Sequence, residues 1–225
     1  VSATYPPFES IGANNEIVGF DIDLAKALCK QMQAECTFTN HAFDSLIPSL
    51  KFRKYDAVIS GMDITPERSK QVSFTTPYYE NSAVVIAKKD TYKTFADLKG
   101  KTVVTTSGTT SERLLKEYND KNQAGMNIIS AKDHGEAFLM LQNGRAQAFM
   151  MDDVLLAGAR AKAEDPAKWE IVGTPMSFEN YGCMMRKDDP AFQKVVNDAM
   201  SAVFKSDEIN KMYKQWFESP IPPKN

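Results

Sequence analysis

The order in which helices and strands follow one another limits the fold of this chain more than any other feature. Residues 45–59 combine an apolar helical stretch, the basic pair Arg53-Lys54 and an apolar strand, and residues 137–150 repeat that order. Alternation of this kind is typical of a helix-covered, mainly parallel β-sheet. Because the order occurs twice, we predict an α/β protein with two lobes of one architecture.

The other segments extend this alternation along the chain. We expect helices at residues 20–32, 43–51, 111–119, 135–142, 154–163, 190–204 and 206–217, and a short one that begins at Pro66. We expect strands at residues 36–39, 57–60, 72–74, 82–87, 101–105, 127–130, 146–150, 169–172 and 181–185. The pattern breaks at residues 88–91, where a second series begins. We predict a discontinuous first lobe of residues 1–86 and 184–225 and a second lobe of residues 87–183. Because open α/β sheets bind ligands at the carboxyl ends of their strands, we expect a ligand cleft between the lobes.

Charge and hydropathy exclude several classes of function. The 225 residues include 27 basic and 29 acidic side chains, which gives a formal net charge of −2. Nucleic acids and anionic membranes are bound by clustered basic side chains, and this balance does not indicate such a cluster. No apolar run approaches the roughly 18 residues of a membrane span. The segment that begins at Val1 has neither a basic nor an apolar leader region, so we expect a processed or partial chain.

A polar turn after the first buried strand is the first candidate binding site. It places Ser60, Gly61, Asp63, Thr65 and Arg68 in one short segment. An arginine side chain can donate two parallel hydrogen bonds to a carboxylate, and nearby hydroxyl and amide groups can complete an anion site. The alternative is that Arg68 is a solvated residue in a surface helix.

A hydroxyl-rich segment at residues 106–112 is the second candidate. It contains Thr109 and Thr110 at a strand-to-helix junction, where free backbone N–H groups bind anions. The alternative is an ordinary helix cap formed by Thr110 or Ser111. The spacing of a P-loop is absent, so this type of nucleotide site is excluded.

The end of the apolar strand at residues 146–150 is the third candidate. Asp152 and Asp153 follow this strand, and a carboxylate there suits a bound ammonium group. Capping of the helix that begins at Val154 is an equally good interpretation. His134 lies in a loop-to-helix segment, where a histidine more often caps a helix than contacts a ligand.

The chain offers no recognisable arrangement for catalysis or metal binding. It lacks the GxSxG motif, and its two histidines, His41 and His134, limit acid–base schemes, although Asp63 or Asp152 could serve. It also lacks CxxC and HExxH motifs. We expect a binding protein with no enzymatic activity, no metal and no cofactor.

The three cysteines allow two interpretations. Cys29 and Cys36 are seven positions apart at an expected helix-to-strand corner, where they could form a disulfide or remain two buried thiols. Cys183 is the remaining cysteine, and we expect it to be a packed thiol and not a nucleophile. The spacing alone leaves the choice between disulfide and thiols open.

Five motifs distributed along the chain together indicate a family. They are Tyr5-Pro6-Pro7-Phe8, Gly19-Phe20-Asp21-Ile22-Asp23-Leu24-Ala25, Phe43-Asp44-Ser45-Leu46-Ile47-Pro48-Ser49-Leu50, Asp56-Ala57-Val58-Ile59-Ser60-Gly61-Met62 and Thr65-Pro66-Glu67-Arg68. The chain resembles, over nearly its whole length, the periplasmic amino-acid-binding proteins of polar-amino-acid ABC transporters, which have the type II solute-binding fold. The resemblance implies a periplasmic monomer that delivers an amino acid to a membrane permease, without nucleic acid or membrane insertion.

The resemblance also implies a role for individual residues. Arg68 would hold the ligand α-carboxylate, with further contacts from Thr109 and Thr110, and Asp152 would hold the α-ammonium group. The other matching ligand positions are Tyr5 and Phe43, which would enclose the ligand side chain, and Ser60, Gly61, Asp63, Thr65 and His134. A disulfide between Cys29 and Cys36 is implied as well.

The two parts of the chain resemble different members of the family. Residues 1–100 are similar to an arginine-binding protein, whereas residues 101–225, including the motif at 221–225, are similar to a glutamate/aspartate-binding protein. This difference suggests an engineered or recombined hybrid with a join near residues 97–101.

The mixed resemblance bears on which amino acid is bound. In the relatives for acidic ligands, first-lobe arginines neutralise the ligand side chain, but Ser2 and either Ser45 or Leu46 occupy those positions here. Burying a carboxylate without a partner is costly, whereas aromatic residues favour a cation. We expect a basic amino acid, with arginine favoured. The alternatives are glutamate or aspartate binding, a lobe-swap hybrid with weak or no binding, and a dehydratase on the same fold.

Overall fold

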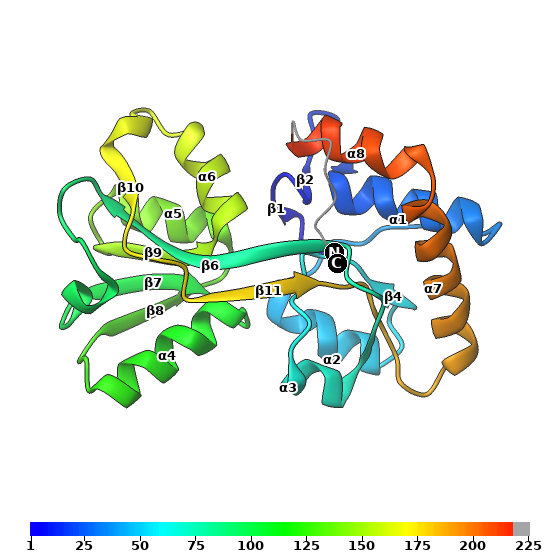
Figure 1. Cartoon of the computed structure of the whole chain (residues 1–225), viewed down its shortest axis with the longest axis horizontal. Helices are drawn as coiled ribbons and strands as arrows, with labels where there is room; N and C mark the ends of the chain where they lie inside the picture. The colour runs from blue at the N-terminus through cyan, green and yellow to red at the C-terminus, as the bar shows by residue number, and fades with distance from the viewer. Residues whose placement is uncertain (218–225) are drawn as a thin grey trace. The chain divides into compact units, whose positions relative to one another are not determined.

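The structure is a computed structural model that describes residues 1–217. It divides into two compact units, which are visible in Figure 1. Unit 1 contains Val1–Glu80 and the chain from Glu179 on, and unit 2 contains Asn81–Phe178. The expected lobe boundaries, after residue 86 and before residue 184, lie a few residues further along the chain at both crossings. The motif at residues 221–225 lies outside the described residues.

Two strands carry the chain across the division. Strand β6 (Tyr79–Lys88) leaves unit 1 and β11 (Ser177–Tyr181) returns to it. The two strands pair with each other, as Figure 1 shows. Unit 2 is therefore one continuous insertion in the sequence of unit 1.

Unit 2 is built around a twisted sheet with three parallel strands. Its strands are β7 (Thr102–Thr106), β8 (Asn127–Ala131), β9 (Ala148–Asp152) and β10 (Trp169–Ile171), together with most of β6. Both β8 and β9 pair in parallel with β7, and β6 and β10 continue the sheet antiparallel. The parallel strands are followed by α4 (Thr110–Asn122), α5 (His134–Gln142) and α6 (Asp153–Ala161). This is the predicted alternation, and it brings the ends of three strands to one edge.

Unit 1 combines helices with two small sheets. Its helices are α1 (Phe20–Gln31), α2 (Leu46–Lys51), α3 (Pro66–Gln71), α7 (Pro190–Phe204) and α8 (Asp207–Phe217). One sheet contains β1 (Thr4–Tyr5), β2 (Glu9–Ile11) and β3 (Ile17–Val18), and the other contains β4 (Ala57–Val58), β12 (Met184–Met185) and β5 (Ser73–Phe74). Three short 3-10 helices complete the two units, at Phe43–Ser45, Phe95–Leu98 and Pro166–Lys168.

The strand directions in unit 1 correct part of the sequence-based prediction. A mainly parallel sheet was expected in each lobe, but the described pairings of unit 1 are antiparallel. The reason is that β12 comes from the far end of the chain and lies between β4 and β5. The prediction of a strand at residues 36–39 is also wrong, because these described residues form no ladder. The Val1 amino group donates a hydrogen bond to the Thr39 carbonyl, at 3.2 Å, without extending into a strand pair.

Aromatic rings form the centre of unit 1. The rings of Phe20 and Tyr213 have centroids 5.0 Å apart, and those of Phe8 and Tyr181 are 5.2 Å apart. These contacts join the N-terminal segment and α1 to α8 and the strand that re-enters unit 1. Burial of such large rings supplies much of the apolar stabilisation of a domain.

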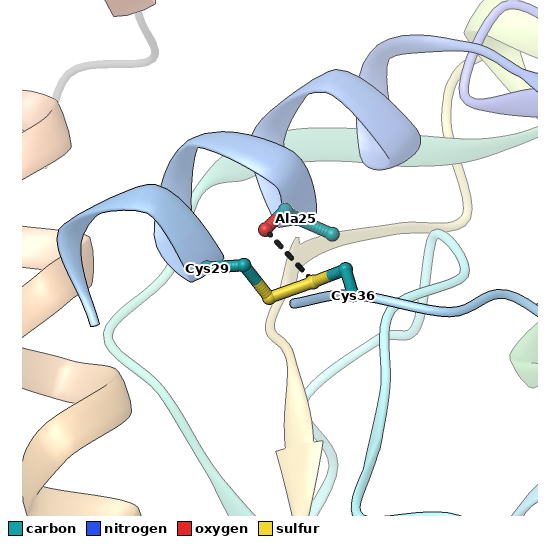
Figure 2. The surroundings of a disulfide bond; sticks show 3 residues. All are labelled: Ala25, Cys29 and Cys36. Atoms are coloured by element: carbon teal, nitrogen blue, oxygen red, sulfur yellow. Dashed lines mark hydrogen bonds between the residues drawn. A yellow bond between two sulfur atoms is a disulfide. The ribbon is translucent and has the colours of Figure 1, made fainter. Parts of the chain in front are cut away.

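A disulfide fastens the end of α1 to the following loop (Figure 2). It joins Cys29 and Cys36, the pair that the resemblance implies, with Cα atoms 6.0 Å apart. Ala25 lies one turn before Cys29 in α1, and its carbonyl oxygen is 3.5 Å from the Cys36 sulfur. Cys183 is a buried free thiol.

Loss of this disulfide should destabilise unit 1 moderately. Because the bridge closes a loop of seven residues, the chain-entropy model assigns it about 2 kcal/mol. We expect the Cys29→Ser/Cys36→Ser variant to lose this amount in urea unfolding. A reductant should lower the stability of the parent protein and leave the variant unchanged. Equal stability of oxidised parent and variant would contradict the prediction.

No helix within residues 1–217 combines the length and the apolar character that crossing a membrane requires.

Candidate ligand-binding residues

The turn after β4 is held in place on two sides. The Gly61 amide donates a hydrogen bond of 2.8 Å to Asp21 Oδ2, and the Ile64 amide donates one of 2.8 Å to the Asn180 carbonyl. Gly61 has a φ of +49°, and a Cβ atom there would lie 2.3 Å from the Tyr5 ring. The turn therefore needs glycine for both its backbone conformation and its contact with Tyr5.

Arg68 lies in the first turn of α3 and points back toward this turn. Thr65 caps the helix, since its hydroxyl accepts a hydrogen bond of 3.2 Å from the Arg68 amide. The guanidinium group donates to the Asp63 carbonyl at 2.9 Å and lies 3.9 Å from the Asp63 carboxylate. Its carbon atom is 5.7 Å from the centroid of the Phe43 ring. Arg68 is only 8% exposed, so the interpretation as a solvated surface residue is wrong.

The aromatic candidates have different surroundings. Tyr5 is buried, stacks on Phe8 with centroids 5.2 Å apart, and shares a hydrogen bond with the Tyr181 hydroxyl. Phe43 is half-buried in the 3-10 helix before α2, beside Arg68. Unit 1 thus brings Phe43, Asp63, Thr65 and Arg68 together, and it places Gly61 against Tyr5.

Unit 2 gathers its four candidates at the edge where the parallel strands end. Thr109 and Thr110 follow β7, His134 follows β8, and Asp152 is the last residue of β9. The Ser107 amide donates to the Ala131 carbonyl at 2.9 Å, which ties the first two loops together. All four candidates are buried.

The hydroxyl groups of the β7–α4 loop divide into two sets. Thr109 is the cap of α4: its hydroxyl accepts from the Glu112 amide at 3.1 Å and donates to the Thr106 carbonyl at 2.7 Å. The capping alternative considered for Thr110 or Ser111 is therefore wrong, because the cap is one residue earlier. The hydroxyls of Thr110 and Ser111 are buried and have no hydrogen-bond partner within the described chain. Such groups are costly unless something else binds them.

The Asp152 carboxylate does not cap α6. Asp152 occupies the N-cap position, but its side chain makes no capping hydrogen bond, so the capping interpretation is wrong for Asp152, whereas the Asp153 carboxylate accepts a hydrogen bond of 2.7 Å from the Val154 amide. The neighbouring Asp153 carboxylate accepts from the Ser82 hydroxyl at 2.6 Å. Asp152 therefore places a buried carboxylate at the sheet edge that also carries Thr110 and His134.

His134 is neutral at physiological pH. Its Nδ1 atom lies 2.8 Å from the Thr106 hydroxyl, and the residue is 5% exposed. Burial lowers the pKa of His134 from 6.5 to about 4, and nearby Asp133 opposes this shift only in part. The site in unit 2 therefore contains a neutral imidazole and not a cation.

Acid should destabilise unit 2 through His134. Because the folded-state pKa is lowered, the unfolded chain takes up the proton first, and stability falls as the pH drops from about 6.5 toward 4. The difference between the two pKa values corresponds to about 3 kcal/mol. The His134→Gln variant should no longer show this part of the pH dependence. In a Trp216→Phe background, Trp169 remains as the tryptophan of unit 2, so its fluorescence reports urea unfolding of that unit. Parallel pH profiles for the parent protein and the His134→Gln variant would contradict the prediction.

Two buried acidic residues escaped the sequence analysis. Glu9 and Asp21 are fully buried beside Ser60 and Gly61. In the sequence, Asp21 was named only as part of a family motif, and no local signal marked Glu9. Their pairing depends on segments that meet only in the folded unit.

The fold and these residues define a class of protein. Two α/β units are linked by two strands, and each presents polar groups suited to the charged ends of a small solute; this is the construction of a two-lobed solute-binding protein. Residues 1–219 match the bacterial extracellular solute-binding proteins, family 3, and the chain belongs to that family. The family resemblance found in the sequence is thereby confirmed.

Individual relatives bind different amino acids. ABC transporter arginine-binding protein 1 of Escherichia coli K12 is 57% identical, over 96% of this chain and 88% of the relative. The L-glutamate/L-aspartate-binding protein of Pseudomonas aeruginosa is 45% identical, over 97% of this chain and 75% of the relative. A solved periplasmic binding protein of Salmonella typhimurium, described for its high arginine specificity, is 44% identical with a TM-score of 0.88, and the match covers 96% of each chain.

Proposed function

We propose that this protein binds a free basic L-amino acid, with L-arginine favoured, and delivers it to the membrane permease of an ABC transporter. The observation that carries the proposal is the buried guanidinium group of Arg68, fixed by the Asp63 carbonyl at 2.9 Å. A fixed arginine fork suits the α-carboxylate that every such ligand shares. The arginine-binding relatives support the choice of ligand.

The charged ends of the ligand each have a proposed partner. Arg68 holds the α-carboxylate, and the backbone and hydroxyl groups of Thr109 and Thr110 at the start of α4 add donors to it. The buried Thr110 hydroxyl, which has no partner within the described residues, supports this role. Asp152 receives the α-ammonium group. Ser60, Gly61 and Thr65 shape the turn that holds Arg68.

The side chain of the ligand distinguishes arginine from glutamate. Tyr5 and Phe43 supply aromatic surface, which favours a cation. His134, with a pKa of about 4, offers no positive charge to a glutamate side chain at neutral pH. A buried glutamate carboxylate without a cationic partner costs several kcal/mol. Glutamate or aspartate remains the alternative, favoured by the 45% identical relative.

Location and chemistry follow from the same proposal. The disulfide between Cys29 and Cys36 suits an oxidising compartment, which supports a periplasmic location. The protein acts by binding and release, without a chemical reaction on its ligand. Asp63, one of the carboxylates considered for acid–base work, lies 3.9 Å from the Arg68 guanidinium, and this ion pair disfavours that use.

The hybrid origin suggested by the sequence can be stated more narrowly. A join near residues 97–101 lies inside unit 2, which spans Asn81–Phe178. A hybrid with this join does not exchange whole lobes, because β12, α7 and α8 of unit 1 then come from the second parent.

The test is isothermal titration of ligand-stripped protein with L-arginine and L-glutamate. We expect arginine to bind and glutamate to bind much more weakly. Glutamate binding alone would overturn the choice of ligand and assign specificity to the β7–α4 loop and His134. Absence of binding by both, in a protein that unfolds cooperatively, would overturn the proposed function. L-arginine amide, which lacks the α-carboxylate, is the matched control for the role of Arg68.

A further inference from the structure

Glu9 and Asp21 form a buried acidic pair beneath the turn after β4. Both residues are 0% exposed. Glu9 Oε1 accepts a hydrogen bond of 2.5 Å from the Ser60 hydroxyl. Asp21 Oδ2 accepts bonds from the Gly61 amide at 2.8 Å and from the Tyr78 hydroxyl at 2.9 Å. The two acids therefore bind two consecutive residues of the turn.

The second oxygen of each acid indicates a shared proton. Glu9 Oε2 and Asp21 Oδ1 are buried, and neither has a donor in the described part of the chain. A proton on one of these oxygens would supply the donor that the other lacks, and the charges of the two carboxyl groups act on each other. Two ionised carboxylates have only acceptors, so a bond between them requires that one carries a proton. Buried acid pairs commonly hold one proton for this reason.

The pKa shifts of both carboxyl groups agree with this geometry. Burial raises the pKa of Glu9 well above its usual value, and the charge of Asp21 raises it further. Burial also raises the pKa of Asp21, to about 6, while its bonds from Gly61 and Tyr78 oppose the shift. At neutral pH, Glu9 is thus the proton donor and Asp21 the ionised acceptor.

The other titratable groups that face the pair are largely neutral. Burial raises the pKa of Tyr78 well above 10 and that of Cys183 to about 12, so both keep their protons. Val1 also faces the two acids, and burial lowers the pKa of its amino group. The neutral Tyr78 hydroxyl and Cys183 thiol therefore add no negative charge beside the pair.

We propose that Glu9 and Asp21 share one proton and act together as positioning residues, which hold Ser60 and Gly61 in the conformation that ligand binding requires. The inference rests on the proposed function, since Gly61 packs on Tyr5 and the same turn continues to Asp63, which fixes Arg68. The acids touch no ligand themselves. They act through the Ser60 hydroxyl and the Gly61 amide, and a change in the pair would release these two groups.

Two variants at position 9 separate the proton from the shape of the side chain. Glu9→Gln replaces the protonated acid by an amide, which can donate to Asp21 and accept from Ser60. Glu9→Leu has a similar volume and can do neither. The measurements are the infrared band of a protonated carboxyl group at pH 7.5, the exchange rate of the Gly61 amide, the affinity for L-arginine and the thermal unfolding temperature.

We expect the protonated carboxyl band in the parent protein and its loss in Glu9→Gln. Gly61 exchange and arginine affinity should stay within about threefold of the parent in Glu9→Gln, and Glu9→Leu should bind about tenfold or more weakly, with faster exchange at Gly61. Absence of the band in the parent would overturn the shared proton. Parent-like exchange of the Gly61 amide in Glu9→Leu would overturn the positioning role. If Glu9→Leu does not fold, faster exchange of the Gly61 amide in Glu9→Gln would overturn that role. Because the band and the exchange rate need no ligand, they remain decisive if arginine fails to bind.

Discussion

Replacing Arg68 with alanine should abolish measurable arginine binding. The substitution removes the proposed partner of the ligand α-carboxylate and leaves that carboxylate desolvated, which costs about 3–5 kcal/mol for a buried charge pair. This corresponds to a loss of affinity of about two to three and a half orders of magnitude. Arg68→Lys keeps the charge but not the two-pronged geometry, so we expect it to bind more weakly than the parent and more tightly than the alanine variant. Isothermal titration with L-arginine measures all three.

The control must account for the role of Arg68 within unit 1. Its guanidinium group lies 3.9 Å from the Asp63 carboxylate, which is only 5% exposed, so Arg68→Ala also leaves a buried acid without its nearest cation. Thermal unfolding of each variant therefore accompanies the titration. Arg113→Ala, in the surface pair with Glu117 on α4, is the matched control and should leave affinity unchanged. Parent-like affinity of a folded Arg68→Ala protein would contradict the proposed ligand geometry.

Alanine at Gly19 should have the largest effect on stability. This residue precedes α1 with a φ of +143°, and a Cβ atom there would lie 2.0 Å from the Phe8 carbonyl oxygen and 2.5 Å from its carbon. Both are backbone atoms, and the Phe8 carbonyl also accepts the Asp21 amide at 2.9 Å. The chain cannot move away without breaking the start of α1. We expect a loss of about 4 kcal/mol or more, or failure to fold.

Urea unfolding followed by circular dichroism measures this loss. Gly125→Ala is the control for backbone strain alone, because Gly125 has a φ of +60° and no atom within 4 Å of an added Cβ. It should cost only about 1–2 kcal/mol. A loss in Gly19→Ala no larger than that in Gly125→Ala would contradict the prediction that the contact with Phe8 makes this position the more costly one.

Local patterns in the sequence predicted the α/β alternation and most helix positions. The start of α3 was expected at Pro66, because a proline suits the first position of a helix. The short polar turn with Arg68 was also recognised, because its residues lie close together in the sequence. Its burial was not, since the solvent exposure of one arginine depends on residues such as Phe43 that are distant in sequence.

The features that were missed or predicted wrongly depend on long-range contacts. Residues 37–39 have a β-prone composition, but a strand also needs a partner along its length. The antiparallel sheet of unit 1 depends on β12, more than 100 residues after β4 and β5. Likewise, nothing local to Glu9 shows that it meets Asp21 and Ser60. Pairings of this kind become visible only when the whole unit is assembled.

The insertion of unit 2 into unit 1 also sets an order of folding. Unit 2 is one continuous stretch, and its parallel strands follow one another closely, so its contacts close short loops. Unit 1 begins the chain but cannot be completed until β12, α7 and α8 have been made, because β12 separates β4 from β5.

We predict from this order that pulse-labelled hydrogen exchange during refolding shows protection of β7 before protection of β4. Protection of β4 before β7 would contradict the prediction. During synthesis, residues 1–80 cannot complete unit 1 before β12, α7 and α8 have been made, so the segment that carries Glu9 and Asp21 is among the last parts of the protein to become fixed.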